Sequence, residues 1–209
     1  MRLRSLKDKD ILLDNCDYLI KNYKEIKGNW QKKFKNNNPI HLEIGMGKGD
    51  FIQGMARKYP DINFIGIEKY DKVIGRAIKK YPVKLPNLFV INMDAKDLEK
   101  AFDKEISHIY LNFSDPWPKD RHAKRRLTSI EFLKIYDKVF KDKKRITLKT
   151  DNLILFASSL VSLNNYGYKF LNVNLDLANS DIPNVLTEYE VKFQNMGVRI
   201  NYLDVEKLN

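Results

Sequence analysis

Strand-like and helix-like segments alternate along the first three quarters of the chain, and this alternation constrains the fold more than any other feature. Short apolar runs bounded by turn residues predict five strands, at residues 40–44, 63–67, 88–92, 109–113 and 145–149. Helical stretches are predicted after them, at residues 51–58, 71–80, 95–102, 129–140 and 152–164. Repeated strand–helix units predict a doubly wound α/β fold, Rossmann-like, with a mostly parallel sheet.

The two ends of the chain depart from this pattern. Residues 168–176 and 190–204 read as strands, and the loop between them, 178–187, has no room for a crossover helix, so the pair should be antiparallel. Residues 1–38 are basic, and apolar residues predict one short amphipathic helix there, at Leu12, Leu13, Tyr18, Leu19 and Ile20. We therefore expect a basic arm at 1–38 and a single domain at 39–209, with a seven-stranded sheet whose C-terminal strand is antiparallel.

Composition bounds the class of protein. With 209 residues, 43% hydrophobic and 31% charged, the chain suits one globular domain. No apolar run approaches the roughly 20 residues of a membrane span, and the amino terminus lacks an apolar signal region, so we expect a cytoplasmic protein. The single cysteine and three histidines exclude a disulfide scaffold and show no zinc-site spacing. A net charge of +11 favours a polyanionic partner.

Acidic residues stand at four of the predicted strand ends. They are Glu43, Glu68, Asp94 and Asp115. Because the carboxyl ends of parallel strands meet at one edge of a sheet, where ligands of open α/β folds bind, these carboxylates predict a ligand site.

A glycine-rich loop follows the first of these strands and opens a helix. Its glycines are Gly45, Gly47 and Gly49. The third residue after Gly47 is Asp50, so the G-x-G-x-x-G fingerprint of nicotinamide cofactors is absent. Glu43 would repel a pyrophosphate but suits a ligand with an ammonium group, which favours S-adenosylmethionine. Glu68 is then placed for the ribose hydroxyls and Asp94 for the adenine. No phosphate-binding G-x-x-x-x-G-K-[ST] loop and no hydrolase G-x-S-x-G turn is present.

The stretch from 110 to 127 reads YLNFSDPWPKDRHAKRRL and combines an acid, an aromatic ring and a run of cations. Singly, an Asp-Pro turn, a core tryptophan and a solvated basic face would explain these residues. Together at the end of a strand they indicate a site for a polyanion. Trp117 has two interpretations, a stacking surface for an unpaired RNA base or a hydrophobic plug beneath the loop.

Six segments in this order resemble the bacterial tRNA (guanine-N7)-methyltransferase family. They are HLEIGMGKGDFI, FIGIEKY, NMDA, YLNFSDPWPKDRHAKRRL, LKTDN and TEYE. The resemblance covers nearly the whole chain, although the Lys-Pro-Trp-Ala stretch of the family is replaced by Leu6, Lys7, Asp8 and Lys9. It implies transfer of the methyl group of S-adenosylmethionine to N7 of the guanosine at tRNA position 46, in the variable loop.

The resemblance also implies roles for individual residues. The cofactor site would contain Glu43, Glu68, Asp94 and Asp115, with Asp115 also the active-site residue, beside the glycine loop. Substrate contacts would come from Lys119, Asp151, Thr187, Glu188, Tyr189 and Glu190. RNA contacts would come from Arg121, His122, Ala123, Lys124, Arg125 and Arg126.

Guanine N7 carries a lone pair and no proton, so its methylation needs alignment more than a general base. Asp115 is then a positioning carboxylate, which accepts hydrogen bonds from guanine N1 and N2 and stabilises the developing positive charge. Glu190 is an alternative source of the same contact, and the sequence does not rank the two.

Two other functions fit parts of the pattern. Asp-Pro-Trp also resembles the Asp-Pro-Pro-aromatic element of methyltransferases that act on exocyclic amines. A non-catalytic RNA-binding module of the same fold is the third possibility, although its acidic strand ends would then lack a purpose. We expect tRNA as partner, no metal and a monomer or homodimer.

Overall fold

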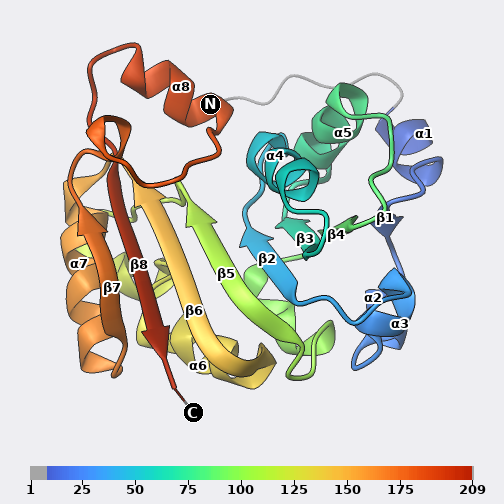
Figure 1. The fold of residues 1–209 in the computed structure, drawn as a ribbon, viewed down its shortest axis with the longest axis horizontal. Helices are drawn as coiled ribbons and strands as arrows, with labels where there is room; N and C mark the ends of the chain where they lie inside the picture. The colour runs from blue at the N-terminus through green and yellow to red at the C-terminus, as the bar shows by residue number, and fades with distance from the viewer. Residues whose placement is uncertain (1–8, 209) are drawn as a thin grey trace.

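The computed structural model describes residues 9–208 and contains one eight-stranded sheet, with α4 and α5 on one face and α6 and α7 on the other (Figure 1). The strand order is β1-β4-β3-β2-β5-β6-β8-β7. Strands β1 to β6 pair in parallel, whereas β8 is antiparallel to both β6 and β7. The strands are β1 (Leu19–Ile20), β2 (Ile40–Ile44), β3 (Asn63–Glu68), β4 (Leu88–Asn92), β5 (Ile106–Asn112), β6 (Phe140–Thr150), β7 (Lys169–Asn174) and β8 (Asn201–Lys207).

Helices connect the parallel strands. The α-helices are α1 (Lys9–Asp14), α2 (Tyr23–Ile26), α3 (Trp30–Phe34), α4 (Asp50–Lys58), α5 (Asp71–Lys80), α6 (Ile130–Val139), α7 (Leu153–Asn165) and α8 (Glu188–Gln194). Three short 3₁₀ helices are η1 (Ala95–Lys100), η2 (Asp120–Arg125) and η3 (Leu177–Asn179). The predicted α/β class, the alternation and the antiparallel C-terminal strand are confirmed. None of the helices within residues 9–208 is long and apolar enough to cross a bilayer.

Four predictions from the sequence are wrong in part. Leu19 and Ile20 do not continue the first helix but form β1, because Val90 N donates to Tyr18 O at 2.8 Å and draws this segment to the edge of the sheet beside β4. The sheet therefore has eight strands instead of seven. The start of the predicted strand 190–204 is helical, because Thr187 and Glu190 form a capping box that begins α8. The residues at 95–102 form the 3₁₀ helix η1, which is shorter than predicted.

The amino-terminal segment contributes to the core. Trp30 is fully buried and donates from Nε1 to Ala101 O at 2.8 Å, and its ring lies 5.5 Å from that of Phe102. Phe34 packs on Phe89 with ring centroids 4.8 Å apart. The division of the chain after residue 38 stays a prediction, and most of the atypical stretch that begins at Leu6 lies outside the described residues.

The strand order places a crevice at the carboxyl end of β2. β2 pairs with β3 on one side and with β5 on the other. The loops that follow β2 and β5 therefore lead to opposite sides of the sheet. Such a switch point is where ligands of open α/β sheets bind. Gly66 in β3 permits a close approach of the loop after β2, because a Cβ at this position would lie 2.5 Å from Met46 Sδ.

Candidate functional site

The loop between β2 and α4 leaves open space beside its backbone. Gly45, Gly47 and Gly49 have φ of 76°, 57° and 84°, the left-handed region that favours glycine. A Cβ at Gly45 or Gly47 would meet no atom within 4 Å. The amides of Gly45 and Met46 donate to Ile67 O at 2.9 and 3.0 Å, which ties the loop to the end of β3. The loop is thus fixed in position, while Gly45 and Gly47 remain accessible to a ligand and Gly49 is buried.

Glu43 is the most unusual carboxylate of the site. It is 2% exposed, its Oε1 accepts a hydrogen bond from Asn112 Nδ2 at 2.8 Å, and its Oε2 is buried without a hydrogen-bond partner. Burial raises the pKa of Glu43 to about 7, opposed by Asn112 and by the charge of Lys149. A buried carboxylate with an unsatisfied oxygen is suited to a cationic ligand.

Glu68 adds negative charge close to Glu43, and Asp115 adds negative charge close to Glu68. Glu68 accepts from Gly47 N at 3.2 Å and from Tyr70 N at 3.0 Å, so β3 holds it against the glycine loop. Burial raises the pKa of Glu68, and the nearby charge of Asp115 adds to that effect. The charge of Glu68 in turn helps to raise the pKa of Glu43. The structure therefore brings these three predicted carboxylates into one electrostatic cluster.

Asp94 follows the end of β4 and has polar partners that differ from those of Glu43 and Glu68. Its side chain caps η1 by accepting from Lys96 N at 3.0 Å, and its Oδ2 lies 2.8 Å from Lys69 Nζ. Although partial burial opposes them, Lys69 and Lys96 lower the pKa of Asp94. Asp94 is thus kept ionised at the same edge of the sheet.

The loop after β5 has a strained backbone at two residues. Phe113 has φ 51° and Trp117 has φ 42°, values that side-chain-bearing residues rarely adopt. Arg126 is 7% exposed and donates from Nε to Pro116 O at 3.1 Å and from Nη2 to Trp117 O at 3.0 Å. Unlike its predicted neighbours in the basic run, Arg126 therefore points inward and holds the loop that carries Asp115.

The rest of the basic run faces outward. Lys119, Arg121, Lys124 and Arg125 are exposed, and His122 and Ala123 are half-buried. The Arg125 guanidinium lies over the Trp117 ring, 4.8 Å from its centroid, and the His122 ring meets Trp117 edge-on at 5.7 Å. Trp117 is thus half-buried between cationic or aromatic neighbours at the rim, and its two predicted interpretations stay open.

The predicted substrate residues of the C-terminal segment lie against the same edge. Tyr189 stacks on Phe193 with centroids 4.1 Å apart and lies 4.8 Å from the Phe113 ring. Partial burial raises the pKa of Tyr189, and the adjacent Asp151 carboxylate adds to the shift. Glu188 reaches the glycine loop, where its Oε1 lies 2.7 Å from Lys48 Nζ. Glu190 is fully buried and pairs with Lys149, so its carboxylate does not face solvent.

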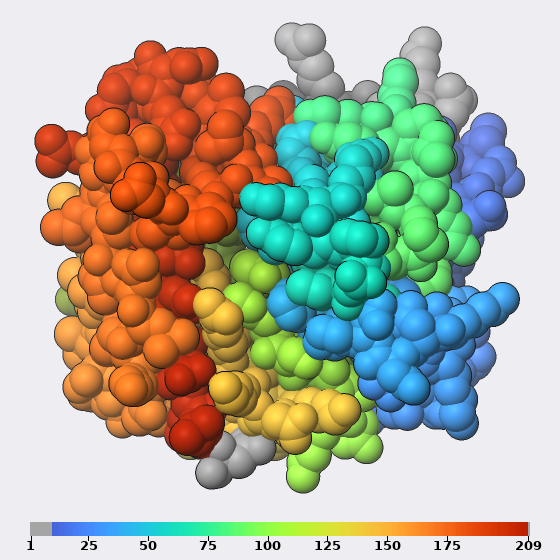
Figure 2. Space-filling view, in the orientation of Figure 1, coloured from blue at the N-terminus to red at the C-terminus, as the bar shows by residue number. Residues whose placement is uncertain are grey.

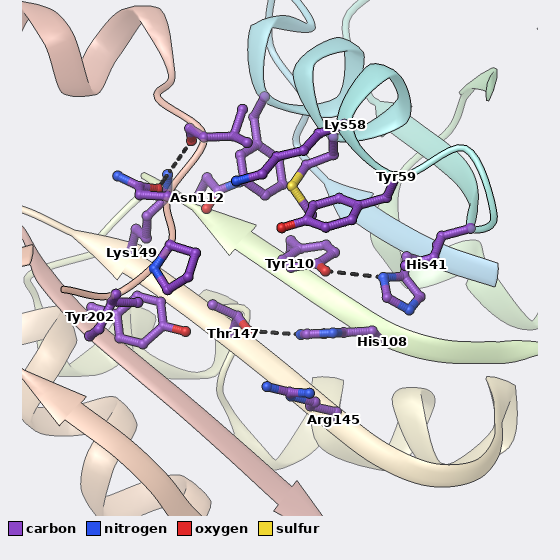
Figure 3. Close-up of a pocket in the computed structure, with 17 residues that line it drawn as sticks. His41, Lys58, Tyr59, His108, Tyr110, Asn112, Arg145, Thr147, Lys149 and Tyr202 are labelled. Carbon is purple, nitrogen blue, oxygen red and sulfur yellow. Dashed lines mark hydrogen bonds between the residues drawn. The ribbon is translucent and has the colours of Figure 1, made fainter. Parts of the chain in front are cut away.

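A cavity of about 280 Å³ lies beside this edge, on the face of the sheet that carries α4. Figure 2 shows the hollow between α4 and the C-terminal segment, with β5 and β6 at its floor. His41 Nδ1 pairs with Tyr110 Oη at 3.0 Å, and His108 Nε2 pairs with Thr147 Oγ1 at 2.7 Å (Figure 3). Burial, together with the charge of Arg145, lowers the pKa of His41 to about 4, so this imidazole is neutral at neutral pH, although Lys58, Arg145 and Lys149 also line the cavity. In the described part of the chain, no cluster of His, Cys, Asp or Glu could hold a metal ion.

Comparisons with known proteins agree on one family. A family model described as "Putative methyltransferase" matches residues 37–203. A tRNA (guanine-N(7)-)-methyltransferase of Lysinibacillus sphaericus is 48% identical over 209 residues, which covers 98% of this chain and 97% of that protein. One of Geobacillus sp. is 52% identical over 192 residues, 90% and 87% of the two chains. The chain belongs to this methyltransferase family. The resemblance drawn from the sequence motifs is confirmed.

Solved structures support the fold of the methyltransferase. An antibiotic-related methyltransferase superposes with a TM-score of 0.62 at 18% identity, covering 87% of this chain and 94% of that chain. A 16S rRNA (adenine(1408)-N(1))-methyltransferase from Catenulisporales acidiphilia, solved with cosubstrate SAM, gives a TM-score of 0.63 at 14% identity, covering 87% and 91%. At these identities the likeness concerns the fold alone.

Two buried polar residues that interact with Glu43 were missed by the sequence prediction. Asn112 donates to Glu43, and Lys149 is a buried cation between Glu43 and Glu190. Asn112 ends β5 and Lys149 stands next to the last residue of β6, and both are buried. A polar residue at such a position is the signal that would have identified them, because a buried amide or ammonium requires a partner.

Proposed function

We propose that this protein transfers the methyl group of S-adenosylmethionine to N7 of a guanosine in tRNA, at variable-loop position 46. The coupled carboxylates around the open glycine loop, with the unsatisfied oxygen of Glu43 among them, carry this proposal. The curated relatives, which are tRNA (guanine-N(7)-)-methyltransferases, support the reaction. A tRNA substrate agrees with a net charge of +11. Such an enzyme would act in the cytoplasm, as a monomer or a homodimer.

The residues at the strand ends fit this cofactor. When bound, S-adenosylmethionine supplies a methyl group made electrophilic by a sulfonium. We assign its positively charged amino-acid end to Glu43, its ribose hydroxyls to Glu68 and its adenine end to Asp94. Three carboxylates at one edge favour a cation there, whereas a dinucleotide pyrophosphate would be repelled. The exposed faces of Gly45 and Gly47 leave room for close backbone approach.

The protein aligns the guanine and does not deprotonate it. Guanine N7 has no proton to lose, so its lone pair needs a fixed approach to the methyl carbon. Asp115 is placed at the end of β5, on a loop held by Arg126, and is assigned to the guanine N1 and N2 hydrogens. The base gains positive charge during methylation, and a fixed carboxylate stabilises that charge.

We assign the remaining predicted contacts to the tRNA. Lys119, Asp151 and the segment 187–190 are assigned to the base, and Arg121, Lys124 and Arg125, which are exposed, to phosphate groups. Glu190 is occupied by Lys149, so we now favour Asp115 for the guanine contact. Arg126 is engaged with the loop backbone, and its contact with RNA stays a prediction.

The experiment is incubation of the protein with methyl-labelled S-adenosylmethionine and unmodified tRNA, followed by digestion to nucleosides. We expect label in 7-methylguanosine, and its loss when guanosine 46 of the transcript is replaced by adenosine. Label on an exocyclic amine would establish the alternative methyltransferase reaction. If calorimetry detected no binding of S-adenosylmethionine, the non-catalytic RNA-binding module would be the better assignment.

A further inference from the structure

The segment between β7 and β8 is weakly anchored by apolar contacts. Between residues 175 and 200 only Leu177, Glu190 and Ile200 are buried, and Leu186, Val191 and other apolar side chains are exposed. This segment nevertheless carries Thr187 to Glu190, which border the proposed guanine site. Val185 packs on α4 and Tyr189 on Phe113, and polar contacts supply much of the remaining anchoring.

Lys149 supplies the most buried of these contacts. It is 2% exposed at the carboxyl end of β6 and donates to Glu190 Oε2 at 2.6 Å, to Val185 O at 3.0 Å and to Asn184 Oδ1 at 3.1 Å. An ammonium group has three N–H donors, so all three are used on this one segment. Its Nζ also lies over the Phe51 ring, 4.9 Å from the centroid, which places it against α4.

The partner carboxylate closes the same network. Glu190 is 0% exposed, and its Oε1 accepts from Asn184 Nδ2 at 2.5 Å while its Oε2 accepts from Thr187 N at 3.4 Å. Lys149 therefore connects β6 both to the loop before α8 and to the first turn of α8. The other ion pairs of this helix, those of Glu188 with Lys48 and with Lys80, are exposed, and exposed pairs contribute little.

We infer that Lys149 is a positioning residue, which holds residues 184–190 in the place required for tRNA binding. This inference rests on the proposed function and deepens it. Lys149 does not touch the reacting atoms and acts through Glu190, Asn184 and the Val185 carbonyl. The close fit of the loop on α4 depends on the same placement, since a Cβ at Gly54 would lie 2.5 Å from Val185 Cγ1.

The test compares Lys149→Met with the double variant Lys149→Met/Glu190→Gln. The single variant leaves a buried carboxylate without its cation, which is strongly destabilising, whereas the double variant removes both charges and keeps the protein folded for measurement. Lys144→Met is the matched control, because Lys144 lies in the middle of the same strand, away from residues 184–190, and pairs with Asp137 at 2.8 Å.

Hydrogen exchange is the first readout and needs no activity. In the double variant we expect amides between residues 184 and 199 to exchange about tenfold faster or more, while amides of β8 keep their wild-type rates. The KM for tRNA should rise about tenfold, and the dissociation constant for S-adenosylmethionine at pH 8 should stay within about threefold. Lys144→Met should leave both the exchange of this segment and the KM unchanged.

Unchanged exchange in residues 184–199 of the double variant, or an unchanged KM for tRNA, would overturn the positioning role. Failure of the proposed function looks different, because wild-type protein would then methylate no tRNA. In that case the exchange experiment still decides whether Lys149 holds the segment.

Discussion

The two sides of the site are built in different ways. The proposed cofactor side consists of the ends of β2, β3 and β4, most of whose residues are buried, with a glycine loop tied to β3 by backbone hydrogen bonds. The proposed substrate side consists of the loop 113–119 and the segment 175–200, in which Arg126 and Lys149 supply buried charged contacts. The difference suggests that a small cofactor needs a rigid, preformed edge, whereas a large RNA needs a surface that side chains can adjust.

The largest effect is expected at the boundary of the two sides. Asp115→Ala should lower kcat for tRNA methylation about 10²- to 10³-fold, because a fixed carboxylate at the guanine edge would be lost. Binding of S-adenosylmethionine, measured by calorimetry, should weaken only moderately. Asp120→Ala, on the neighbouring η2, is the control and should retain normal turnover. Near-normal turnover in Asp115→Ala would remove Asp115 from the guanine site.

Arg126 tests whether the substrate side depends on single charged side chains. Arg126→Ala should lower the free energy of unfolding by about 1.5–3 kcal/mol, because two carbonyls lose a charged donor. It should also lower kcat, whereas Arg125→Ala should leave stability unchanged. Denaturant unfolding and steady-state kinetics measure the two effects. Equal stability of the two variants would show that the loop does not depend on Arg126.

The cofactor side should respond to pH through Glu43. Its pKa is raised from 4.5 to about 7, so the folded protein holds this proton more tightly than the unfolded chain. Glu43 therefore stabilises the fold least above pH 7, and its contribution to stability declines as pH rises from about 4.5 to about 7. The ionised form binds a cation better, so affinity for S-adenosylmethionine should increase about tenfold between pH 5.5 and 7.5. Calorimetry of Glu43→Gln should show a weaker and much flatter pH profile.

The smallest expected effect concerns the exposed cations. Replacing both Arg121 and Arg125 by Ala should reduce the slope of log affinity for tRNA against log salt by about one to two, since two phosphate contacts would be lost. Filter binding at several salt concentrations measures this slope. Binding of S-adenosylmethionine should not change. An unaltered slope would place the RNA interface elsewhere on the molecule.

The sequence predicted best the elements whose residue patterns are local. Strands such as β2 and β4, and helix α5, were located within a residue because their apolar patterns are local and their ends carry turn residues. The strand β1 was missed because two residues carry no periodicity, and only pairing with β4 makes them a strand. Helix α8 was misread because its apolar residues are few and its capping box was not recognised.

Side-chain orientation was harder to predict than secondary structure. The basic run indicated a cationic surface, yet nothing local shows that Arg126 turns inward while Arg125 covers Trp117. The partnership of Lys149 with Glu190 joins residues 41 positions apart. Contacts of this kind depend on the assembled fold, which a pattern of neighbouring residues does not contain.

Phe113 combines an unfavourable backbone conformation with a ring contact between the end of β5 and α8. Its φ of 51° would suit glycine, and a bulky residue in this conformation costs about 1–3 kcal/mol. Its ring, however, lies 4.8 Å from that of Tyr189 and thereby joins the end of β5 to α8. Phe113→Gly would relieve the backbone and remove that ring contact. The backbone conformation alone would favour glycine here. The aromatic residue therefore indicates that the ring contact with Tyr189 is needed for function.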